Sequence, residues 1–191
     1  MPHELLKQHI LSFVSFSEQE LDLIVSKFRL NSYEAKGFIL SEQKVSSDVH
    51  FIVTGLVRTY YVRDGKEITT YLASDQGFVS SYSSFIHQTR SIENIQCLEP
   101  TTTLSISYGE MQELYRLIPQ WEKVGRILAE QTLLCLADRL FKLQSVPAKE
   151  KYLEFLRTSS DKIVRRTPLL HIASFLGIAP ESLSRIRKNI S

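Results

Sequence analysis

The sequence predicts an α+β protein: two short helices, an antiparallel β-barrel or jelly roll, a long helix and a C-terminal pair of helices. Three observations support this order. Short runs of aromatic and β-branched residues alternate with turn residues between about Leu30 and Ile106. Apolar residues recur at helical spacing from Pro119 onward. Near the C-terminus, Gly177 separates two short amphipathic segments, as expected where a chain turns sharply between helices.

The first zone holds two short helices. We expect one near residues 3–12 and a second from Ser17, because Ser17-Glu18-Gln19-Glu20 has the spacing of a capping box. Apolar residues at helical spacing follow the box and give the second helix a packing face: Leu21, Ile24, Val25 and Phe28.

The middle zone consists of short strands joined by turns. Asp64-Gly65 suits a tight hairpin, and another turn is expected near Gly77. Many short strands at close spacing are typical of an antiparallel barrel or jelly roll. The expected strands are Phe38–Leu40, Val49–Val53, Leu56–Arg63, Ile68–Leu72, Ile92–Leu98 and Thr102–Ile106.

A long helix follows the strands. Ser107-Tyr108-Gly109-Glu110 is a second capping box that opens a short helix, and Pro119 suits the first turn of a helix running to about Gln144. The long helix is apolar on more than one side, so one stripe can cover the barrel while another needs a partner. A parallel dimer seam is expected, and a helix buried between two domains of a monomer is the alternative. The stripe assigned to the dimer helix is Leu117, Trp121, Val124, Leu128 and Cys135, and a second stripe is Ile127, Leu134 and Phe141.

The C-terminal segment has the spacing of a DNA-binding helix-turn-helix. A helix at Ala148–Arg157 precedes it and presents Tyr152, Leu153, Phe155 and Leu156 for packing. Thr167-Pro168 then suits the N-cap and first turn of the next helix. The apolar face of that helix is Leu169, Leu170, Ile172, Ala173 and Leu176, and the inner face of the following helix is Leu183 and Ile186.

The outward face of the last helix, over residues 180–190, is polar and mostly basic. Such side chains suit base edges and phosphates in a major groove. The alternative is an ordinary structural pair of helices. The outward residues are Glu181, Ser182, Ser184, Arg185, Arg187 and Lys188.

Charge is divided unevenly along the chain. Residues 142–191 hold ten Lys and Arg against four Asp and Glu, whereas residues 1–141 hold thirteen against seventeen. We therefore expect only the C-terminal third to bind a polyanion.

No apolar run is long enough to cross a bilayer, and the N-terminus lacks the pattern of a signal peptide, so a cytoplasmic protein is expected. Cys97 and Cys135 are too few for an iron–sulfur cluster, no metal site is expected, and His50 is interpreted as a core-edge residue.

In this order, the zones resemble the Crp/Fnr family of bacterial regulators over nearly the whole length. Ile172–Lys188 is similar to the family's recognition-helix signature, and the chain resembles short members common in Bacteroidetes. The resemblance implies a cyclic-nucleotide-binding-like effector domain at 1–118, a long dimerisation helix at 119–145 and a helix-turn-helix DNA-binding domain at 146–191. It also implies that Glu181 and Arg185 contact base edges, while Ser182, Arg187 and Lys188 contact phosphates.

The sequence departs from the family's pattern at two places near its end. Pro180 stands where relatives often have another base-contacting arginine, which puts the family's usual half-site in doubt. The chain stops at Ser191, without the β-hairpin wing of its relatives. Either DNA affinity is lower or Arg165, Arg166 and other basic residues compensate.

The family's effector pocket is the least similar part. The corresponding residues are Gly77, Ser81, Tyr82, Arg90 and Ser91. Ser81 replaces the glutamate that accepts the ribose hydroxyl, so cyclic AMP is not the expected ligand. Arg90 with Ser91 could still hold an anion. A small anionic or apolar effector and an empty, degenerate pocket both remain open, and no cofactor is required.

These expectations combine into a homodimeric transcription regulator that is not an enzyme. Its expected partners are double-stranded DNA, a second copy of the chain and RNA polymerase, with no membrane. The alternative is an effector-binding signalling module that acts through protein contacts without sequence-specific DNA binding. No activated nucleophile, paired-carboxylate site or catalytic phosphate loop is visible in the sequence.

Overall fold

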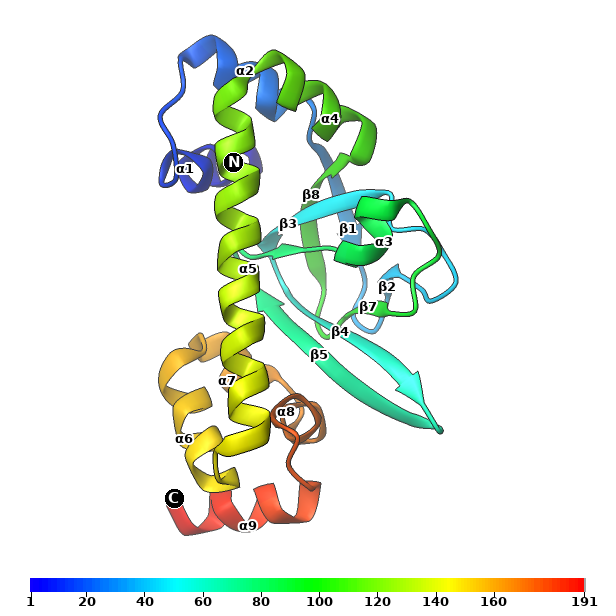
Figure 1. The fold of residues 1–191 in the computed structure, drawn as a ribbon, viewed down its shortest axis with the longest axis vertical. Coiled ribbons are helices and arrows are strands. Elements are labelled where there is room, and N and C mark those ends of the chain that lie inside the picture. Colours follow the sequence, from blue (N-terminus) through cyan, green and yellow to red (C-terminus); the bar gives the residue numbers. More distant parts are fainter. Residues whose placement is uncertain (191) are drawn as a thin grey trace.

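The computed structural model describes residues 1–190. One long helix, α5 (Pro119–Ser145), runs along most of the molecule (Figure 1). The strands lie on one side of α5, the N-terminal helices lie near its start, and the C-terminal helices lie near its end (Figure 1). The helix begins at Pro119, as the sequence predicts, because proline at this position has no amide hydrogen to leave unsatisfied.

Both predicted capping boxes are present. The N-terminal helices are α1 (Pro2–Leu11) and α2 (Glu18–Ser26), and α4 (Tyr108–Leu117) follows the last strand. The backbone N–H of Ser17 donates to the Glu20 carboxylate at 2.8 Å, and Ser107 makes the same bond to Glu110 at 3.0 Å. These short-range bonds satisfy amides that a helix start leaves open.

The strands form two four-stranded antiparallel sheets. One has the order β1-β8-β3-β6 and the other β2-β7-β4-β5, so each sheet keeps two edge strands. The predicted antiparallel arrangement is confirmed, and the two sheets do not close into a barrel. The strands are β1 (Arg29–Tyr33), β2 (Phe38–Leu40), β3 (Asp48–Thr54), β4 (Leu56–Arg63), β5 (Lys66–Ser74), β6 (Phe78–Val79), β7 (Asn94–Cys97) and β8 (Thr101–Ser107).

Four elements were not among the sequence expectations: β1, β6, the short helix α3 (Tyr82–His87) and α7 (Asp161–Arg166). Strands β1 and β6 lie at sheet edges, where a short segment gains its structure from a partner strand rather than from its own pattern. Helix α7 follows the polar residues Ser159 and Ser160. Ser160 caps it by accepting from the Ile163 N–H at 3.3 Å.

Three apolar clusters hold the fold together. The first joins α1, α2, α4 and the start of α5 to one sheet, with Phe51 and Leu104 on the sheet side. The second lies between the two sheets and includes Ile52 and Ile95. The third packs the C-terminal helices against Leu72 of β5. The C-terminal helices thus share a core with the sheet that carries β5 rather than being tethered only by α5.

The stripe assigned to a dimer seam lies only partly on the outside: Cys135 is exposed on α5 and Leu117 is 56% exposed, whereas its central residues are covered. Trp121 and Val124 are buried at 2% and 1% exposure among the N-terminal helices, Leu128 packs against the same cluster, and Leu117 belongs to α4. The assignment is wrong for Trp121 and Val124, because helical spacing marks an apolar face without telling what covers it. The exposed apolar residues of α5 are Leu133, Leu134, Leu136, Leu140 and Phe141.

The C-terminal helices are α6 (Ala148–Thr158), α7, α8 (Leu169–Leu176) and α9 (Pro180–Ile190). Gly177 ends α8 in the left-handed conformation at φ 63°, as predicted. Two expectations fail here. Thr167 does not cap α8, because the N-cap is Pro168 and the Thr167 hydroxyl has no hydrogen-bond partner among residues 1–190. Leu153 and Leu170 are exposed rather than packed.

Candidate functional site

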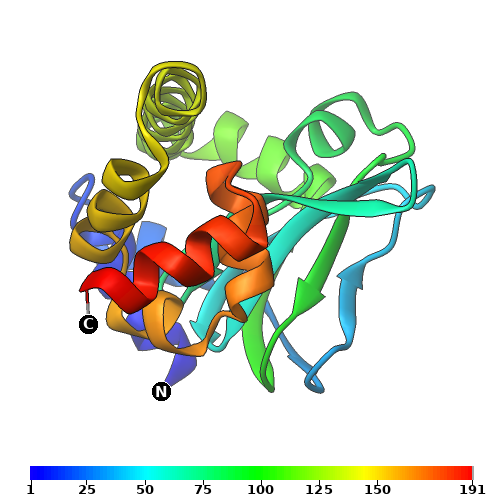
Figure 2. The same cartoon turned by 90° about the horizontal axis from the view of Figure 1, so that it is seen from below.

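Helix α9 forms the end of the molecule and exposes a polar face. Seen from below, it crosses the surface as the outermost C-terminal helix (Figure 2). Leu183 is fully buried against α6 and α8, which fixes the orientation of α9 around its axis. Four charged residues of α9 are exposed, Glu181, Arg185, Arg187 and Lys188, and Ser182 and Ser184 are half-buried.

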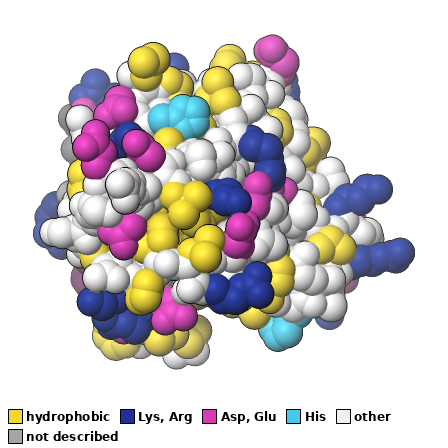
Figure 3. Space-filling model, turned by 90° about the horizontal axis from the view of Figure 1, so that it is seen from above, with side chains coloured by type: hydrophobic (Ala, Val, Ile, Leu, Met, Phe, Trp, Pro, Cys, Tyr) yellow, Lys and Arg dark blue, Asp and Glu magenta, His cyan; other side chains and the backbone are white. Residues whose placement is uncertain are grey.

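Two of these charges lie one turn apart on α9. Arg185 is exposed, and its Nε donates to the backbone carbonyl of Glu181 at 3.4 Å. The face at the other end of the molecule, which carries α2 and α4, instead mixes acidic, basic and hydrophobic side chains (Figure 3). Away from α9, Arg165 and Arg166 have carboxylate partners: Arg165 lies 3.5 Å from Asp161, and Arg166 lies 3.2 Å from Glu99.

Helix α8 is bonded to β5 through polar groups. The Ser174 hydroxyl accepts from the Thr69 N–H at 2.9 Å and donates to the Glu67 carbonyl at 3.1 Å. Arg139 of α5 donates from Nη2 to the carbonyls of Thr69 at 3.2 Å and Phe175 at 3.1 Å. One side chain of the long helix therefore contacts both the sheet and α8.

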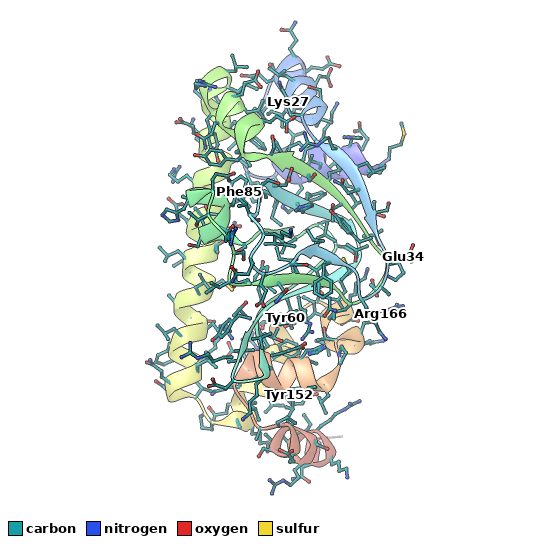
Figure 4. All side chains as sticks on the ribbon, turned by 90° about the vertical axis from the view of Figure 1, so that its right-hand side faces the viewer. Lys27, Glu34, Tyr60, Phe85, Tyr152 and Arg166 are labelled. Carbon is teal, nitrogen blue, oxygen red and sulfur yellow. The ribbon has the colours of Figure 1, made fainter. Side chains whose placement is uncertain are left out.

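A second polar contact joins β4 to α8. Arg58 is 3% exposed, and it lies over the ring of Tyr60, which Figure 4 labels. Its guanidinium donates to Glu67 at 2.6 Å and to Nδ1 of His171 at 2.8 Å. Burial lowers the pKa of His171, and the nearby positive charge of Arg58 lowers it further. Nδ1 of His171 therefore accepts a hydrogen bond from a side chain of the sheet.

A cleft of about 1140 Å³ lies between α5, the sheets and the C-terminal helices. Of the five residues expected to form an effector pocket, Gly77 and Tyr82 line this cleft. Ser81 and Ser91 are each 2% exposed and lie behind its surface. Arg90 is exposed and does not line the cleft, so the expected anion-binding pair of Arg90 and Ser91 does not form there.

The sequence expectations missed Glu93, which does line the cleft. Its carboxylate accepts from the hydroxyls of Ser81 at 3.0 Å and Thr70 at 3.3 Å. The Ser91 hydroxyl in turn donates to Ser81 Oγ at 2.9 Å. No sequence signal connects Thr70 with Glu93, because the two meet only through the pairing of strands.

The histidines and cysteines do not assemble into a metal site. Within residues 1–190, no three His, Cys, Asp or Glu side chains lie where they could hold one ion. His50 is 8% exposed and lies 3.2 Å from the Thr103 hydroxyl, and burial lowers its pKa to about 4. Cys97 is buried and Cys135 is exposed on α5, and both thiols are free. In the described part of the chain, no helix combines the length and apolar character needed to span a membrane.

Comparison with known proteins agrees with this architecture. Residues 30–117 match the cyclic nucleotide-binding domain family. No curated protein matches the chain in sequence. Among solved structures, FixK2 from Bradyrhizobium japonicum has 17% identity and a TM-score of 0.74, covering 85% of this chain and 84% of that one.

Two further structures extend over more of the chain. The c-di-GMP-responsive global regulator CLP from Xanthomonas campestris has 15% identity and a TM-score of 0.71, covering 91% of each chain. A CooA mutant from Carboxydothermus hydrogenoformans has 19% identity and a TM-score of 0.68, covering 94% of this chain and 81% of that one. These structures are similar to the chain over most of its length, as the resemblance inferred from the sequence implies, and at these identities what the chains share is the fold.

Proposed function

We propose that this protein is a homodimeric DNA-binding transcription regulator of the Crp/Fnr type, in which α8 and α9 form the helix-turn-helix. The observation that carries the proposal is the surface of α9. Its apolar side is held by Leu183 in the C-terminal core, its other side presents Glu181, Arg185 and Lys188 outward, and Arg187 is also exposed. A helix held in this way can enter a major groove without leaving its own domain.

In the proposed complex, some of these residues contact base edges and others contact phosphates. Arg185 and Glu181, near the start of α9, suit base edges, and an arginine placed on guanine discriminates by roughly 1–3 kcal/mol. Lys188 and Arg187, together with Ser182 and Ser184, suit phosphates, which position the helix without specifying sequence. RNA polymerase is a further proposed partner, and the cytoplasm is the proposed location.

The second copy of the chain would pack on the outer face of α5. Nine residues at about 100° each place Leu133 half a turn around the helix from the buried Val124. Leu140 lies seven residues further on the same side, and both leucines are exposed. A parallel seam along this face would set two copies of α9 one helical turn of DNA apart. The proposed seam is Leu133, Leu134, Leu136, Leu140 and Phe141.

Cyclic AMP is not the proposed effector. Arg90 lies outside the cleft, Ser81 stands at the position of the expected glutamate, and Glu93 presents a carboxylate to the cleft instead. A phosphate placed beside Glu93 would meet like charge there.

DNA selection followed by affinity measurement tests the proposal. The purified full chain is exposed to random duplexes at about 50–100 mM salt, since phosphate contacts weaken steeply above this range. The Arg185→Ala variant should bind the selected site about tenfold to a hundredfold more weakly. Lys188→Ala should weaken binding to all sequences and lower the salt slope by about one.

Arg116→Ala is the matched control, because Arg116 is exposed on α4 and far from α9 along the chain. It should leave affinity unchanged. Failure to enrich any sequence, or equal affinity of the Arg185→Ala variant and the wild type for the enriched site, would favour a signalling module that does not bind DNA specifically.

A further inference from the structure

Among the carboxylates that line the cleft within residues 1–190, Glu93 differs from Asp138 and Glu154, which both pair with Lys142. Lys142 pairs with Asp138 and Glu154, and Arg139 is bonded to backbone carbonyls. Neither carboxylate oxygen of Glu93 has a Lys, Arg or His partner in this part of the chain. The cleft therefore contains one carboxylate whose charge is not balanced by a neighbouring cation.

Neutral hydroxyls hold this carboxylate in place. Ser81 donates to Oε2 at 3.0 Å and Thr70 donates to Oε1 at 3.3 Å. Ser81 is itself fixed by the Ser91 hydroxyl at 2.9 Å, and the Glu93 N–H donates to Ser91 Oγ at 2.9 Å. A carboxylate offers about four lone-pair positions. Two donors leave acceptor capacity for a further hydrogen-bond donor from the cleft.

A β-bulge brings Thr70 to this position. In the β4–β5 pair, Thr59 faces Tyr71 and Tyr60 faces Thr69, so Thr70 is the extra residue. Its hydroxyl also lies 3.2 Å from the Thr59 carbonyl. A β-bulge redirects a side chain and interrupts the regular ladder of hydrogen bonds between the two strands. Here the redirected side chain contacts the one unbalanced carboxylate of the described cleft lining.

Aromatic side chains line the same cleft, and one of them, Phe85, is tied to Ser81 by a backbone hydrogen bond of 2.8 Å. Tyr82 follows Ser81 directly and is 48% exposed, and it lies close enough to Tyr115 to raise the pKa of that phenol in addition to the larger effect of burial. Phe85 packs against Tyr108 with ring centroids 5.4 Å apart. Figure 4 places Phe85 on the α5 side of the sheets. Aromatic faces attract cations, most strongly where water is excluded.

We propose that this corner of the cleft is a binding site for a small organic amine, with the protonated amino group on Glu93 and the carbon skeleton against the aromatic side chains. Charge complementarity selects the ligand class: the free acceptor positions of Glu93 match the three N–H donors of an ammonium group. Anionic nucleotides would be repelled by the same carboxylate. The amine site itself does not depend on the proposed function. Only the role of the amine as the effector of a transcription regulator rests on it.

Strand β5 provides the route from this site to the DNA-binding helices. Thr70 bonds Glu93, and its neighbour Thr69 bonds Ser174 of α8 and Arg139 of α5 through its backbone. A ligand that moves Glu93 and Thr70 must therefore act on the strand that positions α8. It shifts the helices only if it binds one arrangement more tightly than the other.

Calorimetric titration of the full-length protein without DNA tests the site. Phenethylamine is the probe, and phenethyl alcohol is its neutral counterpart with the same skeleton. The amine should bind saturably with a Kd of about 1 mM or tighter, as expected for a ligand of this size. The alcohol should bind at least about tenfold more weakly, the effect of losing a charge-assisted hydrogen bond.

The Glu93→Gln variant keeps the shape of the side chain and removes its charge, so it should lose the preference for the amine over the alcohol. Glu34→Gln should behave as wild type, because Glu34 lies at the edge of the molecule opposite α5 (Figure 4). Thermal melting of both variants verifies folding, and Thr70→Val gives an independent variant with an expected loss of about threefold in amine affinity.

Three results would overturn the proposal: no saturable amine binding, equal binding of amine and alcohol, or an unchanged preference in Glu93→Gln. Tight binding of cyclic AMP or cyclic di-GMP in the cleft without amine binding would also overturn it. None of these results depends on DNA binding, so a failure of the amine site is distinguished from a failure of the proposed regulator.

Discussion

The two halves of α5 have similar apolar content and opposite surroundings. In the first half, residues 119–128, Trp121 and Val124 are almost fully buried by the chain's own N-terminal helices. In the second half, residues 129–145, Leu134 is 70% exposed and Leu133 is 67% exposed. The comparison teaches that an amphipathic pattern fixes where apolar faces lie and leaves open whether the same chain or another one covers them.

The largest effect is expected in the buried half. Trp121→Ala removes an indole that contacts Phe16 and Phe28 and donates to Met111 Sδ at 3.1 Å. The resulting cavity should lower the free energy of unfolding by about 3–5 kcal/mol. Urea denaturation followed by circular dichroism measures this loss. Lys123→Ala, an exposed position on the same half, is the control and should change stability by less than about 0.5 kcal/mol.

Acid should lower the stability of the sheets, against which the buried half of α5 packs. The pKa of His50 is about 4 in the folded protein because of burial, whereas an unfolded histidine titrates near 6.5. As the pH falls through this interval, protons bind the unfolded chain first and stabilise it. Between about pH 7 and pH 4 the protein should lose roughly 3 kcal/mol through this residue.

Urea titrations at several pH values measure that slope. His50→Gln removes the titrating group, and its stability should therefore depend less steeply on pH than that of the wild type. A variant with an unchanged slope would show that other groups cause the acid sensitivity.

The exposed half should govern association rather than folding. Leu140→Glu keeps a good helix former and places a charge on the proposed seam. The free energy of dimerisation should become less favourable by about 2 kcal/mol or more, which corresponds to a dimer that is roughly thirtyfold weaker. Sedimentation velocity across a dilution series detects the change. Leu153→Glu places the same charge on an exposed leucine of α6 and should leave the dimer intact.

The smallest effect is expected where the end of α5 meets the turn between α8 and α9. An alanine Cβ at Gly177 would lie 2.7 Å from Leu143 Cδ2, and the φ of 63° disfavours any L side chain. Gly177→Ala should therefore lower stability by about 1–2 kcal/mol.

Gly65→Ala separates the two causes, because Gly65 has a φ of 71° and open space around its Cβ position. The Gly65→Ala variant therefore loses stability only through its unfavourable backbone conformation, without a steric clash. If thermal melts give equal losses for both variants, the contact between Gly177 and Leu143 contributes nothing to stability.

Local rules predicted much of the fold. Ser17 with Glu20, Ser107 with Glu110, and Pro119 mark helix starts because each acts on groups within one turn of its own position. Edge strands β1 and β6 were missed because their structure comes from partner strands distant in the chain.

The candidate sites divide in the same way. The polar face of α9 follows from a helical repeat, and the residues expected to be exposed there largely are. The effector pocket was assigned by position alone. Arg90 lies outside the cleft and Glu93 lines it, because strand pairing and a bulge, not spacing in the sequence, determine which side chains reach that surface.

Sequence alone fixed where α2, α4 and α5 begin, where α8 ends and that α9 exposes charged residues, since these features depend on neighbours within a few residues. Only the tertiary structure decided that Trp121 belongs to the core, that Arg58 contacts His171 and that Glu93 stands without a cation partner within residues 1–190. Such contacts join residues far apart in the chain, and their energy exists only once the sheets and helices have packed together.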